Sequence, residues 1–271
     1  MMFADPWIAA LSALFLWWFS TGAILLVVRL ADRQGKRAAQ AVTLGSLPLL
    51  VWGGWAYWQT LPVLDVQSAY LAFVAALAVW GWIELAFLTG VITGPVTRPL
   101  PEDVHEWERF IRAWGTVAYH EMVLLAAVLA MAVAGWGAEN PVGLWTFVVL
   151  YFARISAKLN LYLGVPRINT EFIPRALAHL PSHFRIRRMN WLFPFSVVAL
   201  AFACACWLER LWAAESTGGL AGFALLAAIT GLALAEHWLM VLPLPDAKLW
   251  RWMLPAPQTT RPKTPEGHHG F

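Results

Sequence analysis

Five ionisable side chains lie inside stretches of this chain that are apolar enough to span a membrane. They are Glu84, His120, Glu121, Glu236 and His237. Charged groups are costly inside a bilayer, so such residues are candidates for a functional site. A lone carboxylate that faces lipid would lose its hydration or take up a proton. We therefore expect these residues to face inward and to converge near one end of a helix bundle.

Two cations at the end of another apolar stretch, Arg154 and Lys158, lie at similar depth. The simplest interpretation is structural, with Glu84, Glu121 and Glu236 neutralised by the two cations inside the bundle. A second is that His120 or His237 binds a tetrapyrrole, because a neutral imidazole can be an axial ligand of magnesium in a chlorin or of haem iron.

A third interpretation is a metal site built from the same residues. Bundles that hold two irons usually present Glu-x-x-His, which places both ligands on one helix face. Here the pairs are adjacent, His-Glu and Glu-His, so neighbouring side chains diverge by about 100° around the helix. One member of each pair could face a metal. The possible metal or chlorin ligands are His120, His237, Glu84, Glu121 and Glu236.

The longest segment that is not apolar runs from Arg154 to Pro194. Its prolines break it into short pieces, and its basic character prevents it from crossing a bilayer. We predict a structured cytoplasmic platform at about 160–190. Its expected contacts with anionic lipid headgroups or with an acidic partner are Arg167, Arg175, Arg185, Arg187 and Arg188. The two histidines of this segment, His179 and His183, are expected at its surface.

The composition favours a membrane protein. Hydrophobic residues make up 60% of the 271 positions and charged residues 13%, a combination typical of multi-span membrane proteins. The 18 tryptophans suit bilayer interfaces. The two cysteines, Cys204 and Cys206, are too close along one helix to bond to each other.

Seven segments are long enough to span, so we predict an all-α polytopic membrane helix bundle. We place them at 7–30, 41–60, 66–90, 117–136, 141–159, 191–212 and 218–242. Alternate connections, together with the helix ends beside them, hold 18 of the 19 Lys and Arg residues. The positive-inside rule then places the N-terminus in the periplasm and the C-terminus in the cytoplasm. We expect a bundle over 1–254 and a disordered cytoplasmic tail over 255–271.

The platform sequence RISAKLNLYLGVPRINTEFIP, followed by RRMNWLFPFSV, resembles the photosynthetic complex assembly protein 2 family, also called PuhE. The motifs GWIELAFLTG, AYHEMVLL and EHWLMVLPLP fit the same family. These are integral membrane proteins of anoxygenic phototrophic proteobacteria, whose genes accompany those for the reaction-centre H subunit and for bacteriochlorophyll synthesis. The resemblance implies a role in building the photosynthetic apparatus and supplies no catalytic residues.

From this resemblance we expect a non-catalytic assembly or modulation factor for reaction-centre and light-harvesting complexes, or for bacteriochlorophyll supply. It would lie in the bacterial inner (intracytoplasmic) membrane, in contact with lipids and with photosynthetic or pigment-synthesis proteins. The charge pattern does not indicate nucleic-acid binding. The alternative is an enzyme or enzyme subunit of bacteriochlorophyll biosynthesis, which would use a metal ion, bacteriochlorophyll or a precursor at the intramembrane Glu/His residues.

Overall fold

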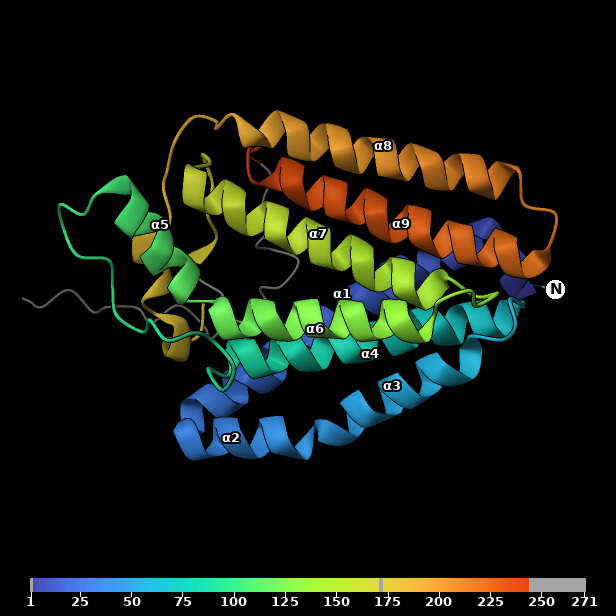
Figure 1. The fold of residues 1–271 in the computed structure, drawn as a ribbon, viewed down its shortest axis with the longest axis horizontal. Coiled ribbons are helices and arrows are strands. Elements are labelled where there is room, and N and C mark those ends of the chain that lie inside the picture. The colour runs from blue at the N-terminus through green and yellow to red at the C-terminus, as the bar shows by residue number, and fades with distance from the viewer. Residues whose placement is uncertain (1, 171–172, 244–271) are drawn as a thin grey trace, which may run out of the picture.

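The computed structural model describes residues 2–170 and 173–243, and these fold as an all-helical bundle (Figure 1). Its long helices are α1 (Pro6–Gln34), α4 (Val66–Leu88), α6 (Ala118–Ala134), α7 (Val142–Leu163), α8 (Leu192–Trp212) and α9 (Thr217–Leu239). Shorter helices are α2 (Lys36–Gly45), α3 (Leu47–Thr60) and α5 (Glu106–Gly115). The described residues also form the 3-10 turns η1 (Met2–Ala4), η3 (Arg175–Leu177) and η4 (Leu180–His183).

Local signals in the sequence set the ends of several helices. The Asp65 carboxylate accepts a hydrogen bond from the Ser68 amide at the start of α4, and Asp5 and Ser216 cap α1 and α9 in the same way. The α7 helix ends at Gly164, whose φ of 118° is open to glycine and strained for other residues. The turn at 163–166 therefore ends α7.

Five helices of the described residues are long and apolar enough to cross a membrane: α1, α4, α7, α8 and α9. A sixth candidate combines α5 with α6, and these two helices meet at an angle of 63°. The segment predicted as one span at 41–60 is instead two helices that meet at Ser46. Pro48 explains the break, because proline removes a hydrogen-bond donor and its ring crowds the preceding turn.

Burial identifies α4 as the centre of the bundle. In its apolar 18-residue window 83% of residues are buried, compared with 17% in α1 and 11% in α8. Around it, α1, α3, α7 and α9 pack on α4, and α1 and α7 also pack on α9. The α8 helix packs mainly on α9, and α6 makes smaller contacts with α4 and α7. Small residues bring α7 and α9 close at one end, where a Cβ on Gly222 of α9 would lie 2.6 Å from the Val142 side chain of α7.

The two ends of the bundle differ in charge. One end carries the N-terminal turn and the connections around Leu61–Asp65, Asn140 and Ser216, which hold no Lys or Arg between them; it is at the right of Figure 1. The opposite, basic end carries α5 and the platform. There the Leu177 and Leu180 side chains pack with Phe87 of α4 in a small second core.

Hydrogen bonds hold the platform to the bundle. The Val165 amide donates to the Arg185 carbonyl, and the Arg187 amide donates to the Val165 carbonyl. These two bonds form an isolated bridge between Val165 and Ile186. The Asn190 amide donates to the Gly164 carbonyl, and its oxygen accepts from the first amides of α8. The described residues of the platform therefore have a defined structure, and the tail predicted at 255–271 lies outside the described residues.

Candidate functional site

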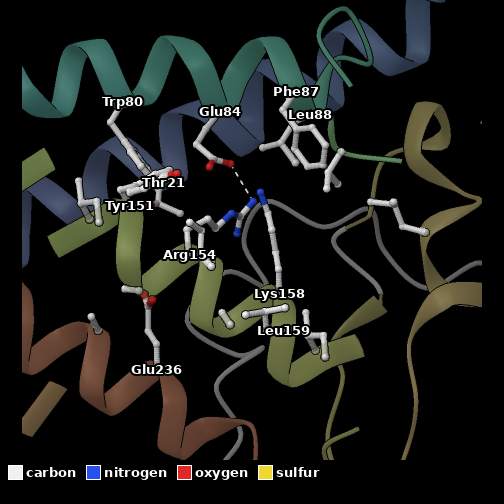
Figure 2. A pocket seen from close by; sticks show the side chains of 18 of the residues that line it. Thr21, Trp80, Glu84, Phe87, Leu88, Tyr151, Arg154, Lys158, Leu159 and Glu236 are labelled. Atoms are coloured by element: carbon white, nitrogen blue, oxygen red, sulfur yellow. Dashed lines mark hydrogen bonds and ion pairs between the residues drawn. The ribbon is translucent and has the colours of Figure 1, made fainter. Parts of the chain in front are cut away.

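A cavity of about 1000 Å³ occupies the basic half of the bundle. Its walls come from α1, α4, α6, α7 and α9, and platform residues such as Leu177 and Pro174 close the basic end. The wall nearer the middle of the bundle is apolar, with Leu14, Leu77 and Ile229. Toward the basic end, charged side chains enter the wall (Figure 2). The cavity is thus apolar at its deep end and polar at the other.

A buried ion pair joins the two long helices on one side of the cavity. Arg154 of α7 donates from Nη2 to Oε2 of Glu84 on α4, over 2.8 Å. The other Glu84 oxygen lies 3.6 Å from Nε2 of His120 and has no hydrogen-bond partner in the described structure. Because Glu84 is 7% exposed, an unpaired charge here would be strongly destabilising.

A second ion pair lies beside the first. Lys158, one turn further along α7, donates to Oε1 of Glu121 on α6. Its ammonium also lies 5.3 Å from the centre of the Phe87 ring, within the range of a cation–π contact. The two cations of α7 are therefore matched by two carboxylates, one from α4 and one from α6, and this arrangement agrees with the structural interpretation of these residues.

Glu236 and His237 lie across the cavity on α9. Oε1 of Glu236 accepts a hydrogen bond of 3.0 Å from the indole nitrogen of Trp17 on α1, and Figure 2 shows the side chain pointing from α9 into the cavity. His237 is buried. Its Nδ1 lies 2.8 Å from the Ala233 carbonyl, so this nitrogen donates, and Nε2 lies 2.9 Å from the Ser156 hydroxyl.

The structure therefore brings the intramembrane residues singled out from the sequence to one region. The residues of this group that line the cavity are Glu84, Glu121, Arg154, Lys158, Glu236 and His237. His120 is fully buried behind Glu84, and its ring lies 4.4 Å from the Phe87 ring, tilted by 36°. Trp17 and Ser156 were not predicted, because nothing in the sequence distinguishes an indole or a hydroxyl that bonds across helices from one that faces lipid.

The ring nitrogens of the two histidines bear on metal or chlorin binding. Both nitrogens of His237 are engaged by Ala233 and Ser156. The imidazole of His120 has no exposed surface and is not part of the cavity wall. Within residues 2–170 and 173–243, no three His, Cys, Asp or Glu side chains are grouped closely enough to hold a metal ion. In this arrangement, ligation by either histidine requires side chains to move.

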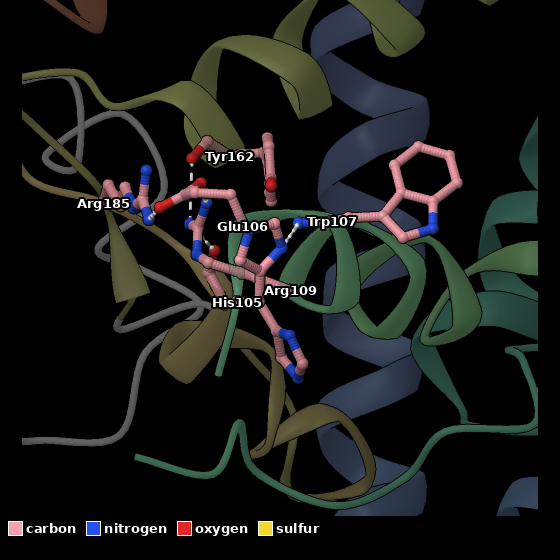
Figure 3. Close-up of polar contacts among 7 residues, drawn as sticks. His105, Glu106, Trp107, Arg109, Tyr162 and Arg185 are labelled. Atoms are coloured by element: carbon pink, nitrogen blue, oxygen red, sulfur yellow. Dashed lines mark hydrogen bonds and ion pairs between the residues drawn. The ribbon is translucent and has the colours of Figure 1, made fainter. Parts of the chain in front are cut away.

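At the basic end, Arg109 of α5 is a key residue that sequence reasoning missed. It is 4% exposed, donates to the carbonyls of Tyr162 and His183 at 3.0 and 2.9 Å, and stacks 4.0 Å from the Tyr162 ring (Figure 3). The sequence presents it on the polar side of an amphipathic helix. In the structure it ties α5 to the end of α7 and to the platform.

The platform arginines divide into two groups. Three have contacts inside the molecule: Arg185 bonds to Glu106 (Figure 3), Arg175 lies 3.9 Å from Asp32, and Arg167 donates to the Leu242 carbonyl. The hydrogen bond from Arg185 holds the pKa of the Glu106 carboxyl below its ordinary value. Arg187 and Arg188 are exposed. These two groups of arginines cannot be told apart from the sequence, because the internal partners come from segments that are distant along the chain.

The platform histidines differ from expectation. His179 and His183 are 7% and 3% exposed, so the prediction of surface positions is wrong. Burial lowers the pKa of both imidazoles. The reason is the fold of the platform itself, since η4 packs against α5 and turns His183 inward beneath Arg109.

Comparison with known proteins places the chain in a family. A family model described as a protein of unknown function, DUF3623, matches residues 3–261. The chain belongs to the DUF3623 family. A relative from Rhodobacter capsulatus, named as an uncharacterized 30.4 kDa protein in the puhA 5′ region, is 53% identical over 93% of this chain and 92% of its own length. No solved structure matches this DUF3623 chain.

Proposed function

We propose that this DUF3623 chain is a non-catalytic membrane factor for the assembly or modulation of photosynthetic reaction-centre and light-harvesting complexes, or for bacteriochlorophyll supply. The observation that carries the proposal is the 53% identical relative, which is named for its place beside puhA in a photosynthesis gene region. The motif resemblance to the photosynthetic complex assembly protein 2 family points the same way.

The structure supports the membrane part of this proposal. Apolar helices run along the length of the bundle, and almost all Lys and Arg residues in the described part of the chain gather at one end. We place that end in the cytoplasm and the protein in the bacterial inner (intracytoplasmic) membrane, crossed by seven segments in which α2 and α3 together form one. The exposed Arg187 and Arg188 then face the cytoplasm, where an acidic partner protein or anionic lipid headgroups could bind them.

Deletion of the gene in a phototrophic host tests the proposal. Membranes of the deletion strain should contain less reaction-centre and light-harvesting absorbance than the parent, and the intact gene supplied on a plasmid should restore it. Separation of the complexes on a sucrose gradient then distinguishes a defect in assembly, with free pigment-protein subunits, from a lack of pigment. Unchanged absorbance and unchanged gradient profiles would contradict a role in the photosynthetic apparatus.

The alternative is an enzyme or enzyme subunit of bacteriochlorophyll biosynthesis. The cavity is the observation that favours it, because three carboxylates and a buried histidine line a space large enough for a small molecule. The absorption spectrum and metal content of the purified protein separate the two proposals. A bound chlorin or a stoichiometric metal that is lost in His120→Ala or His237→Ala, with the protein still folded, would favour the enzyme.

A further inference from the structure

The shape of the cavity indicates an amphipathic occupant. Leu14, Leu77, Leu150, Ile229 and Leu232 line its apolar part, at the middle of their helices. An apolar space of about 1000 Å³ is large enough for the apolar body of a small molecule. The polar part lies at the level of Arg154 and Lys158. A molecule with an apolar body and one polar end would satisfy both parts.

The charge balance of the cavity wall indicates which group the polar end of the occupant should carry. Arg154 and Lys158 are matched by Glu84 and Glu121 in the ion pairs described above. Glu236 has no cation within salt-bridge distance in the described structure, and its hydrogen bond is to an uncharged indole. A carboxylate has room for several donors, and one that faces a largely apolar space with a single donor is poorly satisfied. The unmatched group in the cavity is thus an acid.

A second observation concerns donors and acceptors near Glu236. The Thr21 and Tyr151 side chains lie in the same part of the cavity wall, with Arg154 beyond them (Figure 2). The buried Nε of Arg154 has no hydrogen-bond partner in the part of the chain that the structure describes. Unpaired polar atoms of this kind usually mark a bound molecule or an ordered water.

We propose that the cavity is a binding site for a membrane amphiphile whose polar end carries an amine, with the amine held by Glu236 and the apolar body between α1, α4, α7 and α9. The amine supplies the positive charge and the N–H donors that Glu236 lacks. Trp17 holds the carboxyl group in position by its indole hydrogen bond. The site lies inside the bundle, so its occupancy does not depend on the partners of the platform.

Native mass spectrometry of the full chain in detergent tests the proposal. The probes are phosphatidylethanolamine, phosphatidylcholine and phosphatidic acid with the same acyl chains, together with a long-chain alkylamine. We expect phosphatidylethanolamine to bind about tenfold more tightly than phosphatidylcholine, which has no N–H donor. If the alkylamine binds as tightly as phosphatidylethanolamine, the site accepts amines in general. If the alkylamine does not bind, the site requires the whole phospholipid. Both outcomes support an amine at Glu236.

Three variants complete the test. Glu236→Gln changes the acid with little change of shape and should abolish the preference for phosphatidylethanolamine, whereas Glu209→Gln, an exposed glutamate at the other end of the bundle, should keep it. Ala153→Phe places a ring in the cavity and should remove binding of every probe. A preference for phosphatidic acid, or a preference for phosphatidylethanolamine that survives Glu236→Gln, would overturn the proposal. Because Glu236→Gln is close in shape, the test stands even if Ala153→Phe does not fold.

Discussion

Arg154 donates a hydrogen bond of 2.8 Å to Glu84 across the interface between α7 and α4, at the polar edge of the cavity. This contact links the most buried helix of the bundle to the helix that leads into the platform. Because His120 and Lys158 lie beside it, Glu84 joins the bundle core to the charged residues at its basic end.

Glu84→Gln should therefore destabilise the bundle. Removing one partner of a buried ion pair costs about 3–5 kcal/mol, and we expect about 1–3 kcal/mol here because the Arg154 side chain is 35% exposed. Thermal unfolding in detergent measures the change. The double variant Glu84→Gln with Arg154→Gln should recover part of the loss. If the double variant is as unstable as the sum of the two single variants, the ion pair is not the cause.

Arg109→Met should release α5 from the platform. The guanidinium donates to two backbone carbonyls, and a hydrogen bond from a charged group contributes about 1.5–3 kcal/mol. Limited proteolysis should then cut the connection at 98–108 faster than in the parent. Arg112→Met is the matched control, because its ion pair with Glu108 is exposed and worth at most about 1 kcal/mol. Equal cleavage in the two variants would contradict the anchoring role of Arg109.

The sequence predicted the helices from their apolar length, and it predicted that the intramembrane acids would face inward, since desolvation acts on each residue separately. It did not predict which groups would meet. The partners of Arg109 are backbone carbonyls, which have no signature in the sequence, and the bond from Trp17 to Glu236 depends on how α1 and α9 are rotated against each other. The break between α2 and α3 was missed because an apolar run at 41–60 outweighed Pro48.

Acid should loosen the platform through His183. Burial, together with the nearby Arg109 and Arg112 cations, lowers the pKa of His183 in the folded protein, so the unfolded chain takes up the proton first, near pH 6.5. The stabilisation is complete above that pH and is lost as the pH falls from about 6.5 toward the lowered pKa. Hydrogen exchange of platform amides at pH 7.5 and 5.5 should show the change after correction for intrinsic rates.

His183→Asn removes the titrating group and should make this pH dependence smaller, leaving the part that comes from buried His179. The same substitution at His105, an N-terminal cap of α5, should leave the pH dependence of the platform unchanged. A pH dependence that is identical in the parent and in His183→Asn would show that other groups control the platform.

Replacing Arg187 and Arg188 together by Gln should weaken partner or lipid binding without unfolding the platform, because both side chains are exposed. The loss of binding free energy could reach about 1 kcal/mol for each charge removed at an anionic surface. Co-purification of photosynthetic complexes with the tagged protein measures it. Arg185→Gln, which removes the partner of Glu106, should instead loosen α5. Unchanged co-purification at unchanged protein level would exclude the two exposed arginines from partner binding.

Fusions of a reporter that is active only in the periplasm test the orientation. The reporter should be silent after Phe271 and active in the connection between α8 and α9, because 18 of 19 Lys and Arg residues lie in the connections assigned to the cytoplasm. A third fusion, between Leu61 and Asp65, decides whether α2 and α3 cross as one segment. The 14 residues of α3 extend about 21 Å, which is shorter than the hydrocarbon core of about 30 Å, so α2 must contribute. Activity at this third position supports seven crossings, and silence there would reduce the number and overturn the predicted topology.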